Sequence, residues 1–269
     1  MNGNLQEKYN KLLNILRSTG GLAVAFSGGV DSAFLVYAAH EAPGEKLLAI
    51  TAVTQSYPRH EAADAARILA QYGVKHEEIT LDQLAIPGFC ENGAQRCYYC
   101  KYALFSEIKA EAAKHGITAV ADGANTDDEN DYRPGMRATA ELGILSPLRS
   151  AGFSKQDIRE ASRELGIFTW NKPSYACLAS RIPYGEEITA EKLAMVEKAE
   201  QALLDMGFKE MRVRCHGKVA RIEVAQSDME KVFARRVDIA AAVKAAGFLY
   251  AALDLEGFRS GSLNAALAK

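Results

Sequence analysis

The sequence contains no long apolar run. Its apolar stretches fall well short of the roughly 20 residues that a membrane-spanning helix requires. Residues 1–17 are polar and amphipathic and lack the apolar core of a secretory signal. Membrane-spanning and secreted proteins are therefore disfavoured as classes, and we expect a cytoplasmic protein without a membrane partner.

An excess of charge of either sign is also missing. Lys and Arg number 32 and Asp and Glu number 34, so the formal net charge at pH 7 is −2. A protein that binds nucleic acid non-specifically needs a basic surface, and this balance disfavours one. We expect a small-molecule substrate and no nucleic-acid partner.

Cysteine is scarce, with five residues in a chain of 269. In a cytosolic protein this number does not indicate a disulfide framework, so each cysteine is interpreted as core filler, ligand or reactive thiol. The remaining composition, 48% hydrophobic and 25% charged, is that of an ordinary globular protein. The length fits two domains.

The dominant pattern is an alternation of apolar strand-like segments with amphipathic helix-like segments. Such alternation predicts right-handed crossovers and a parallel sheet. We therefore predict an α/β fold with a doubly wound parallel sheet over residues 1–168. The predicted strands are 22–26, 47–53, 75–80 and 117–121, and the predicted helices are 5–18, 30–40, 59–72 and 99–115, with a cysteine-bearing loop before the last helix.

The pattern changes after residue 173. A helix is predicted at 189–206, a hairpin at 211–225 that turns at His216 and Gly217, a helix at 227–246 and a strand at 248–253. This arrangement predicts a smaller C-terminal α+β domain over residues 169–269, which we expect to bind substrate and to support oligomerisation.

The string Ser27-Gly28-Gly29-Val30-Asp31-Ser32 closes the first predicted strand and opens a helix. Two glycines let the backbone approach an anion, which then faces backbone N–H groups and the helix N-terminus. No Gly-Lys-Ser/Thr follows, so the loop is not of the Walker type. The alternative is a turn in which Ser27 merely caps the helix.

A second polar cluster, residues 122–128, follows the strand at 117–121 directly. Open α/β sheets place ligands at this edge, so the cluster is expected to face the same crevice as the first loop. Carboxylates such as Asp128 could hold magnesium, and Arg133 could offset phosphate charge. The alternative is an acidic turn exposed to solvent.

Cys97 and Cys100 form a Cys-x-x-Cys pair, whose spacing lets two sulfurs share a metal. Alone the pair is ambiguous between a redox pair, half of a zinc site and two unligated thiols. If Cys177 joins them, three thiolates could hold a four-iron cluster with one open iron that carries substrate sulfur. Cys90 and Cys215 have weaker contexts, and Cys215 is interpreted as a buried small hydrophobe.

The loop at residues 27–32 resembles the signature Ser-Gly-Gly-x-Asp-Ser of the PP-loop, or N-type ATP pyrophosphatase, superfamily. The resemblance implies that the loop binds the β,γ-pyrophosphate of ATP with magnesium, and that substrate is adenylated. It assigns this site to five residues: Ser27, Gly28, Gly29, Asp31 and Ser32.

Longer strings narrow the resemblance to the LarE family of sulfur transferases. They include Arg-Cys-Tyr-x-Cys-Lys, Asp-Gly-x-Asn-x-Asp-Asp, Lys-Pro-Ser-x-x-Cys-Leu-x-Ser-Arg and the C-terminal Leu-Asp-Leu-Glu-Gly-Phe-Arg-Ser-Gly-Ser-Leu-Asn. The resemblance implies that the protein adenylates a carboxylate of pyridinium-3,5-biscarboxylic acid mononucleotide and installs sulfur, a step in making the nickel-pincer nucleotide cofactor of lactate racemase.

The resemblance also implies two sulfur routes. In the first, Cys97, Cys100 and Cys177 hold a [4Fe-4S] cluster that delivers sulfide. In the second, Cys177 gives up its own sulfur and becomes dehydroalanine. Because the sequence has all three cysteines, we favour the cluster route. Family members form homo-oligomers, and a hexamer is expected. By the same resemblance, the substrate phosphate is bound by Ser180, Arg181, Arg212 and Arg214, with Glu200 nearby.

Three other functions fit parts of the sequence. A PP-loop tRNA thiolase combines adenylation with Cys-x-x-Cys, but it needs an RNA-binding surface that the charge balance disfavours. An amidotransferase of the superfamily would need a glutaminase domain, for which the chain has no room. A non-catalytic nucleotide-binding module with structural zinc leaves the completeness of the Ser27 to Ser32 signature unexplained.

Overall fold

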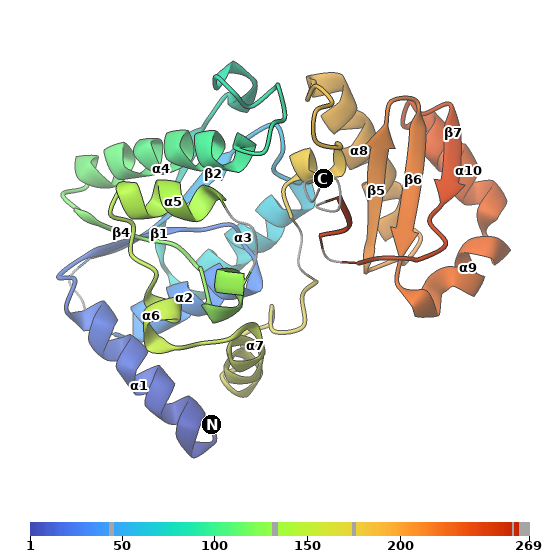
Figure 1. Ribbon diagram of the computed structural model, residues 1–269. Helices are drawn as coiled ribbons and strands as arrows, with labels where there is room; N and C mark the ends of the chain where they lie inside the picture. The colour runs from blue at the N-terminus through green and yellow to red at the C-terminus, as the bar shows by residue number, and fades with distance from the viewer. Residues whose placement is uncertain (43–45, 131–133, 174–175, 260, 264–269) are drawn as a thin grey trace. The chain divides into compact units, whose positions relative to one another are not determined.

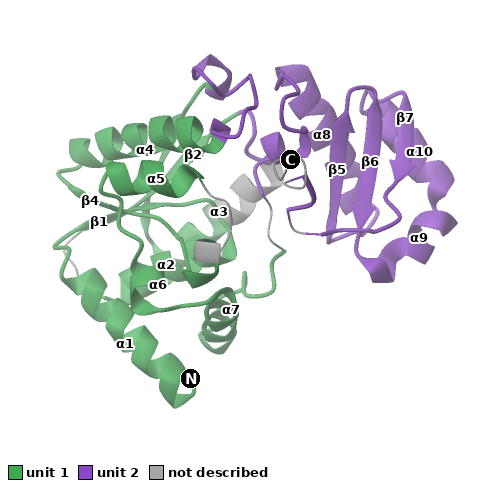
Figure 2. Cartoon of the chain, in the orientation of Figure 1, with its two compact units in different colours: residues 1–54, 59–82, 97–175 green, residues 55–58, 83–96, 176–269 purple. Residues whose placement is uncertain are grey.

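The computed structural model describes residues 1–42, 46–130, 134–173, 176–259 and 261–263 (Figure 1). The chain divides into two compact units (Figure 2). Unit 1 comprises Met1–Thr54, Arg59–Asp82 and Cys97–Tyr175, and unit 2 comprises Gln55–Pro58, Gln83–Arg96 and Ala176–Lys269. The predicted domain boundary at residue 168 stays a prediction.

Unit 1 is built on a four-stranded sheet in the order β3-β2-β1-β4. Every neighbouring pair of strands in this sheet is parallel. The strands are β1 (Leu22–Ala25), β2 (Leu47–Val53), β3 (Lys75–Thr80) and β4 (Ala119–Ala121). The predicted α/β class with a parallel sheet is confirmed.

The central strand β1 is buried on both faces, which its uniformly apolar sequence requires. Val24 packs into a cluster formed with helices on one face, including Phe34 and Ile158. Ala23 points to the opposite face and packs with Phe105 and Ile108. Helices therefore cover both faces of the sheet, as a doubly wound fold demands (Figure 1).

The helices of unit 1 follow the predicted pattern with one notable difference. Helix α4 begins at Arg96, three residues before the predicted start, so Cys97 joins Cys100 in the first helical turns instead of lying in the loop before the helix. Helices α5, α6 and α7 complete the unit. The helices are α1 (Gly3–Arg17), α2 (Val30–Glu41), α3 (Arg59–Tyr72), α4 (Arg96–Lys114), α5 (Pro134–Glu141), α6 (Pro147–Ala151) and α7 (Lys155–Glu164).

Unit 2 contains a three-stranded sheet in the order β5-β6-β7. The predicted hairpin is confirmed: β5 (Met211–His216) and β6 (Val219–Val224) are antiparallel, and Gly217 in the turn has φ +57°, a conformation that favours glycine. Strand β7 (Tyr250–Leu253) runs parallel to β6. The smaller C-terminal α+β region that the sequence predicts is thus present.

Successive side chains of β5 point to opposite faces of the sheet. Met211, Val213 and Cys215 are fully buried on one face, and helix α8 (Ala190–Asp205) packs on β5. Arg212 and Arg214 alternate with them and point to the other face. The helix predicted at 227–246 is interrupted at Arg235, giving α9 (Met229–Ala234) and α10 (Arg236–Ala245).

Within the part of the chain that the structure describes, we find no helix with the length and apolarity needed to cross a membrane.

Candidate active site

Two loops meet at the carboxyl edge of the parallel sheet. The loop after β1 and the loop after β4 flank the position where strand order reverses, which is where open α/β sheets bind ligands. A Cβ built on Gly123 would lie 3.1 Å from the Ser32 nitrogen and 3.2 Å from Asp31 Cβ. The two loops are therefore in contact, and glycine at 123 permits that approach.

The loop after β1 is held by its own serines. Ser27 Oγ lies 3.2 Å from Ser32 Oγ, and Ser32 Oγ donates to the Gly29 carbonyl at 3.2 Å. Gly28 has φ +73°, which a residue with a Cβ adopts only with strain. Because Gly29 caps α2, the first backbone N–H groups of that helix lie in the loop and lack intrahelical acceptors. This arrangement is suited to bind an anion.

Asp31 is the charged residue of this loop, and Lys155 at the start of α7 is its partner. Lys155 Nζ lies 2.6 Å from Asp31 Oδ2. Burial raises the pKa of the Asp31 carboxyl, and Lys155 opposes that shift. Asp31 Oδ1 is buried and makes no hydrogen bond in the described structure. One carboxylate oxygen is thus available to a cation.

Lys155 also joins the second polar loop, since its backbone N–H donates to Asp127 Oδ2 at 3.0 Å. Asp128 Oδ2 accepts from the Asn125 N–H at 3.0 Å and shapes the turn, and its charge contributes to raising the pKa of Asp31. Lys172 Nζ donates to the Gly28 carbonyl at 3.2 Å. Arg133 lies outside the described residues.

These residues fit magnesium with nucleotide phosphate. An orphaned carboxylate oxygen is a hard ligand of the kind that magnesium prefers, and Asp31 Oδ1 provides it. Lys155 and Lys172 supply positive charge at the same loop. When bound, magnesium would neutralise charge on the phosphates and on the departing pyrophosphate.

Cys97 and Cys100 lie three residues apart in the first turns of α4, so their sulfurs share one helix face. Both residues belong to unit 1 and Cys177 belongs to unit 2. Among the described residues, no three His, Cys, Asp or Glu side chains form a metal-binding group.

Arg181, in the short helix η3 (Leu178–Arg181), is fully buried at 0% exposure. Its Nε and Nη2 donate to the two oxygens of Glu200 at 2.8 and 2.9 Å. Its Nη1 donates to Ser180 Oγ at 2.9 Å and to the Ala176 carbonyl at 2.9 Å. Glu200 also accepts from the Val213 N–H at 2.9 Å, which ties α8 to the edge strand β5.

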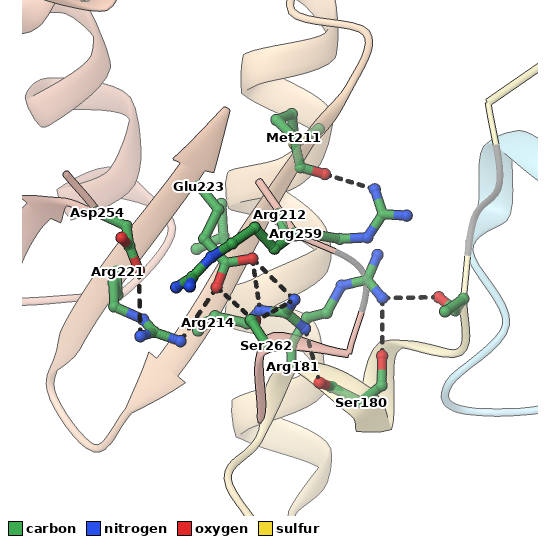
Figure 3. Close-up of polar contacts among 12 residues, drawn as sticks. Ser180, Arg181, Met211, Arg212, Arg214, Arg221, Glu223, Asp254, Arg259 and Ser262 are labelled. Atoms are coloured by element: carbon green, nitrogen blue, oxygen red, sulfur yellow. Dashed lines mark hydrogen bonds and ion pairs between the residues drawn. The ribbon is translucent and has the colours of Figure 1, made fainter. Parts of the chain in front are cut away.

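Arg212 and Arg214 lie on the charged face of the β5–β6 sheet (Figure 3). Arg214 donates to Glu223 Oε2 through both Nε, at 3.0 Å, and Nη2, at 2.8 Å. Ser262 Oγ accepts from Arg214 and donates to Glu223 Oε1 at 2.8 Å. The Arg212 guanidinium lies 4.8 Å from the centre of the Phe258 ring. Arg214 Nη1 also donates to the Ser180 carbonyl at 3.0 Å. Together with the bonds of Arg181 to Ser180 and Glu200, this contact joins four of the predicted residues by direct hydrogen bonds: Ser180, Arg181, Glu200 and Arg214.

Relatives that match almost the whole of this chain show its family. An uncharacterized protein of Synechocystis is 39% identical over 268 residues, which covers 98% of this chain and 100% of the relative. Pyridinium-3,5-bisthiocarboxylic acid mononucleotide synthase of Lactiplantibacillus plantarum is 35% identical over 266 residues, which covers 98% of this chain and 96% of that enzyme.

The chain belongs to the LarE family. A third relative, an uncharacterized protein of Methanocaldococcus jannaschii, is 30% identical over 260 residues, which covers 97% of this chain and 96% of the relative. The family described as asparagine synthase matches residues 13–123, the region that carries the phosphate loop. The resemblance seen in the motifs is confirmed, and the LarE chain is an ATP-dependent sulfurtransferase built on a PP-loop domain.

Sequence reasoning missed several residues of this LarE protein. Lys155 lies 124 positions from Asp31, and a lone lysine at a helix start carries no motif. Glu223 was not predicted either, although it faces Arg212 across the hairpin and neutralises Arg214. Alternation in the predicted second strand could have placed a carboxylate beside two arginines.

Cys215 of this LarE chain will resist thiol reagents in the folded protein. It is fully buried, and burial raises the pKa of its thiol. Brief treatment with a neutral maleimide followed by mass mapping should label the exposed Cys177 well before Cys215, and Cys215 should become reactive only in denaturant. Equal labelling rates of the two thiols in the folded protein would contradict the structure.

Proposed function

We propose that this protein adenylates a carboxylate of pyridinium-3,5-biscarboxylic acid mononucleotide and converts it to a thiocarboxylate. The name of the Lactiplantibacillus relative, a synthase of the bisthiocarboxylic product, supports this substrate. The observation that carries the proposal is the phosphate loop, where Asp31, in the first turn of α2, has a buried carboxylate oxygen with no hydrogen-bond partner among the described residues.

In the first step, a substrate carboxylate oxygen attacks the α-phosphorus of ATP. The bond from the α-phosphorus to the bridging oxygen breaks, and pyrophosphate leaves with that oxygen and its electron pair. The residues proposed to bind the leaving pyrophosphate are Ser27, Gly28, Gly29, Asp31 and Ser32. Lys155 could turn from Asp31 to the phosphates when ATP arrives, because its ammonium already lies at the loop. Asp128 is proposed to assist Asp31 with magnesium.

In the second step, a sulfur nucleophile attacks the acyl carbon of the adenylate and AMP leaves. Adenylation is needed because a free carboxylate has no adequate leaving group. Cys177 is proposed to take part directly, and its exposed position in unit 2 makes its sulfur accessible. The substrate phosphate is proposed to bind at Ser180, Arg181, Arg212 and Arg214, where Glu200 and Glu223 hold two of the guanidinium groups in place.

For the sulfur source, we favour a cluster held by Cys97, Cys100 and Cys177. When bound, a [4Fe-4S] cluster would supply sulfide from its open iron. The helical placement of Cys97 and Cys100 supports this route because it directs both sulfurs to one face. The rival route, in which Cys177 loses its own sulfur and becomes dehydroalanine, needs no other cysteine.

Anaerobic reconstitution with iron and sulfide tests the sulfur source. Iron, labile sulfide and the visible spectrum should show a cluster in the wild type and its loss in Cys97→Ala, Cys100→Ala and Cys177→Ala. Cys215→Ala is the matched control, since Cys215 is buried within β5 and should leave the cluster intact. A wild type that binds no cluster and loses the mass of hydrogen sulfide after turnover would establish Cys177 as the donor.

We further propose a homo-oligomer, a hexamer by family resemblance. Exposed large apolar side chains on α9, α10, β7 and the following turn are available to an interface between subunits. They are Phe233, Val237, Tyr250 and Leu255. Light scattering on the purified protein measures the mass directly.

A further inference from the structure

The thiol of Cys177 is tied to a side chain that no motif indicated. Cys177 Sγ donates to Ser56 Oγ at 2.9 Å. Cys177 itself is exposed, whereas Ser56 is only 2% exposed. A reactive sulfur at the surface is therefore fixed to a buried hydroxyl.

The direction of each hydrogen bond around Ser56 follows from the donors and acceptors present. The Ser56 backbone N–H donates to Gln83 Oε1 at 3.2 Å, so the carbonyl oxygen of the amide faces Ser56. Ser56 Oγ lies 2.6 Å from the same oxygen, which can only accept, so the hydroxyl proton points to Gln83. Ser56 Oγ therefore accepts the hydrogen bond from the Cys177 thiol through a lone pair.

Gln83 is in turn held by the side chain of Gln55. It is 3% exposed and begins the short helix η1 (Gln83–Ala85). Its own N–H donates to Gln55 Oε1 at 2.9 Å. The Leu178 N–H donates to the Ser56 carbonyl at 3.0 Å, so the residue after Cys177 is bound to the same segment. All of these residues belong to unit 2.

This network orients the sulfur and does not carry protons away from it. An amide oxygen is too weak a base to take the hydroxyl proton, so Gln83 does not pass this proton on. Buried polar networks whose members are all satisfied hold one geometry firmly. Reacting atoms must be placed with sub-ångström accuracy, and misplacement by about 1 Å can cost roughly 100-fold in rate.

We propose that Ser56, oriented by Gln83, is a positioning residue that fixes the Cys177 sulfur for the transfer step. The inference rests on the proposed function for the step it serves, but the hydrogen bond itself is a property of the ligand-free protein. Ser56 is not among the residues proposed for adenylation, so its loss should separate the two half-reactions.

The test compares Ser56→Ala, which removes the hydroxyl, with Ser56→Thr, which keeps it. Ser162→Ala is the matched control, because Ser162 is also fully buried and its hydroxyl has no partner in the described structure. Pyrophosphate release and thiocarboxylate formation are followed in a single turnover of the full chain. The Raman S–H band of Cys177 in the ligand-free protein, assigned by difference with Cys177→Ala, reports the hydrogen bond without turnover.

Ser56→Ala should release pyrophosphate at the wild-type rate, form thiocarboxylate about 10- to 100-fold more slowly and shift the Cys177 S–H band to higher frequency. Ser56→Thr should restore most of the transfer rate, and Ser162→Ala should match the wild type in every measurement. An unshifted S–H band, or wild-type transfer in Ser56→Ala, would overturn the inference. If the wild type releases no pyrophosphate, the proposed function fails, and the S–H band still decides whether Ser56 holds the thiol.

Discussion

Asp31→Asn is expected to reduce pyrophosphate release by about 100-fold or more, the scale of losing one electrostatic contact to a transition state. The asparagine keeps the shape of the side chain but removes the charge that pairs with Lys155 and that would hold magnesium. It leaves the glycines and serines of the loop untouched. The rate is measured with ATP, magnesium and the pyridinium mononucleotide by a coupled pyrophosphate assay.

The same variant should be at least as stable as the wild type, which separates loss of chemistry from loss of fold. Burial raises the pKa of Asp31, so the folded protein binds this proton more tightly than the unfolded chain. Protonated Asp31 therefore stabilises the folded protein at low pH, and this contribution is lost as the pH rises through the pKa of the folded state. At neutral pH the ionised carboxylate lowers the free energy of unfolding. Asp31→Asn removes that cost. Urea unfolding at neutral pH that shows clear destabilisation would contradict this account.

Glu200→Ala is expected to lower the free energy of unfolding by about 3–5 kcal/mol, as when one partner of a buried ion pair is removed. Arg181 is fully buried and gives both Nε and Nη2 to this carboxylate. Without Glu200 the guanidinium stays buried without its counter-charge, and the Val213 N–H loses its acceptor as well. Urea unfolding monitored by circular dichroism measures the loss.

Lys192→Ala is the matched control on the same helix. Lys192 forms a more exposed ion pair with Glu186 at 3.7 Å, and pairs of this kind contribute about 1 kcal/mol at most. If Glu200→Ala loses no more stability than Lys192→Ala, the Arg181–Glu200 pair does not have the structural role described here.

Much of the fold could be predicted because its signals are local. The apolar strand at β1 and the helix-forming composition of α2 are each contained within a few consecutive residues. The two polar loops were expected to face one crevice, since parallel strands bring their carboxyl ends to one edge of the sheet. The turn at His216 and Gly217 was predicted from its place between two strand-like segments, and Gly217 has the positive φ that such turns use.

The remaining features depend on contacts between distant parts of the chain. Lys155 reaches Asp31 across 124 residues, and Cys177 reaches Ser56 across 121. Serine and lysine are common residues, and nothing local distinguishes these two from their neighbours. The interruption of the last long helix at Arg235 was missed because no proline or glycine marks it, and the start of α4 was placed three residues too late.

The central claim is that ATP-dependent adenylation and sulfur transfer occur on one pyridinium mononucleotide. The most direct measurement is a single-turnover reaction of the reconstituted protein with ATP, magnesium and pyridinium-3,5-biscarboxylic acid mononucleotide, analysed by mass spectrometry for substrate, AMP and pyrophosphate. The account predicts that each carboxylate converted to thiocarboxylate is matched by one AMP and one pyrophosphate. Release of ADP and phosphate, or pyrophosphate release without any sulfur-containing product, would contradict it.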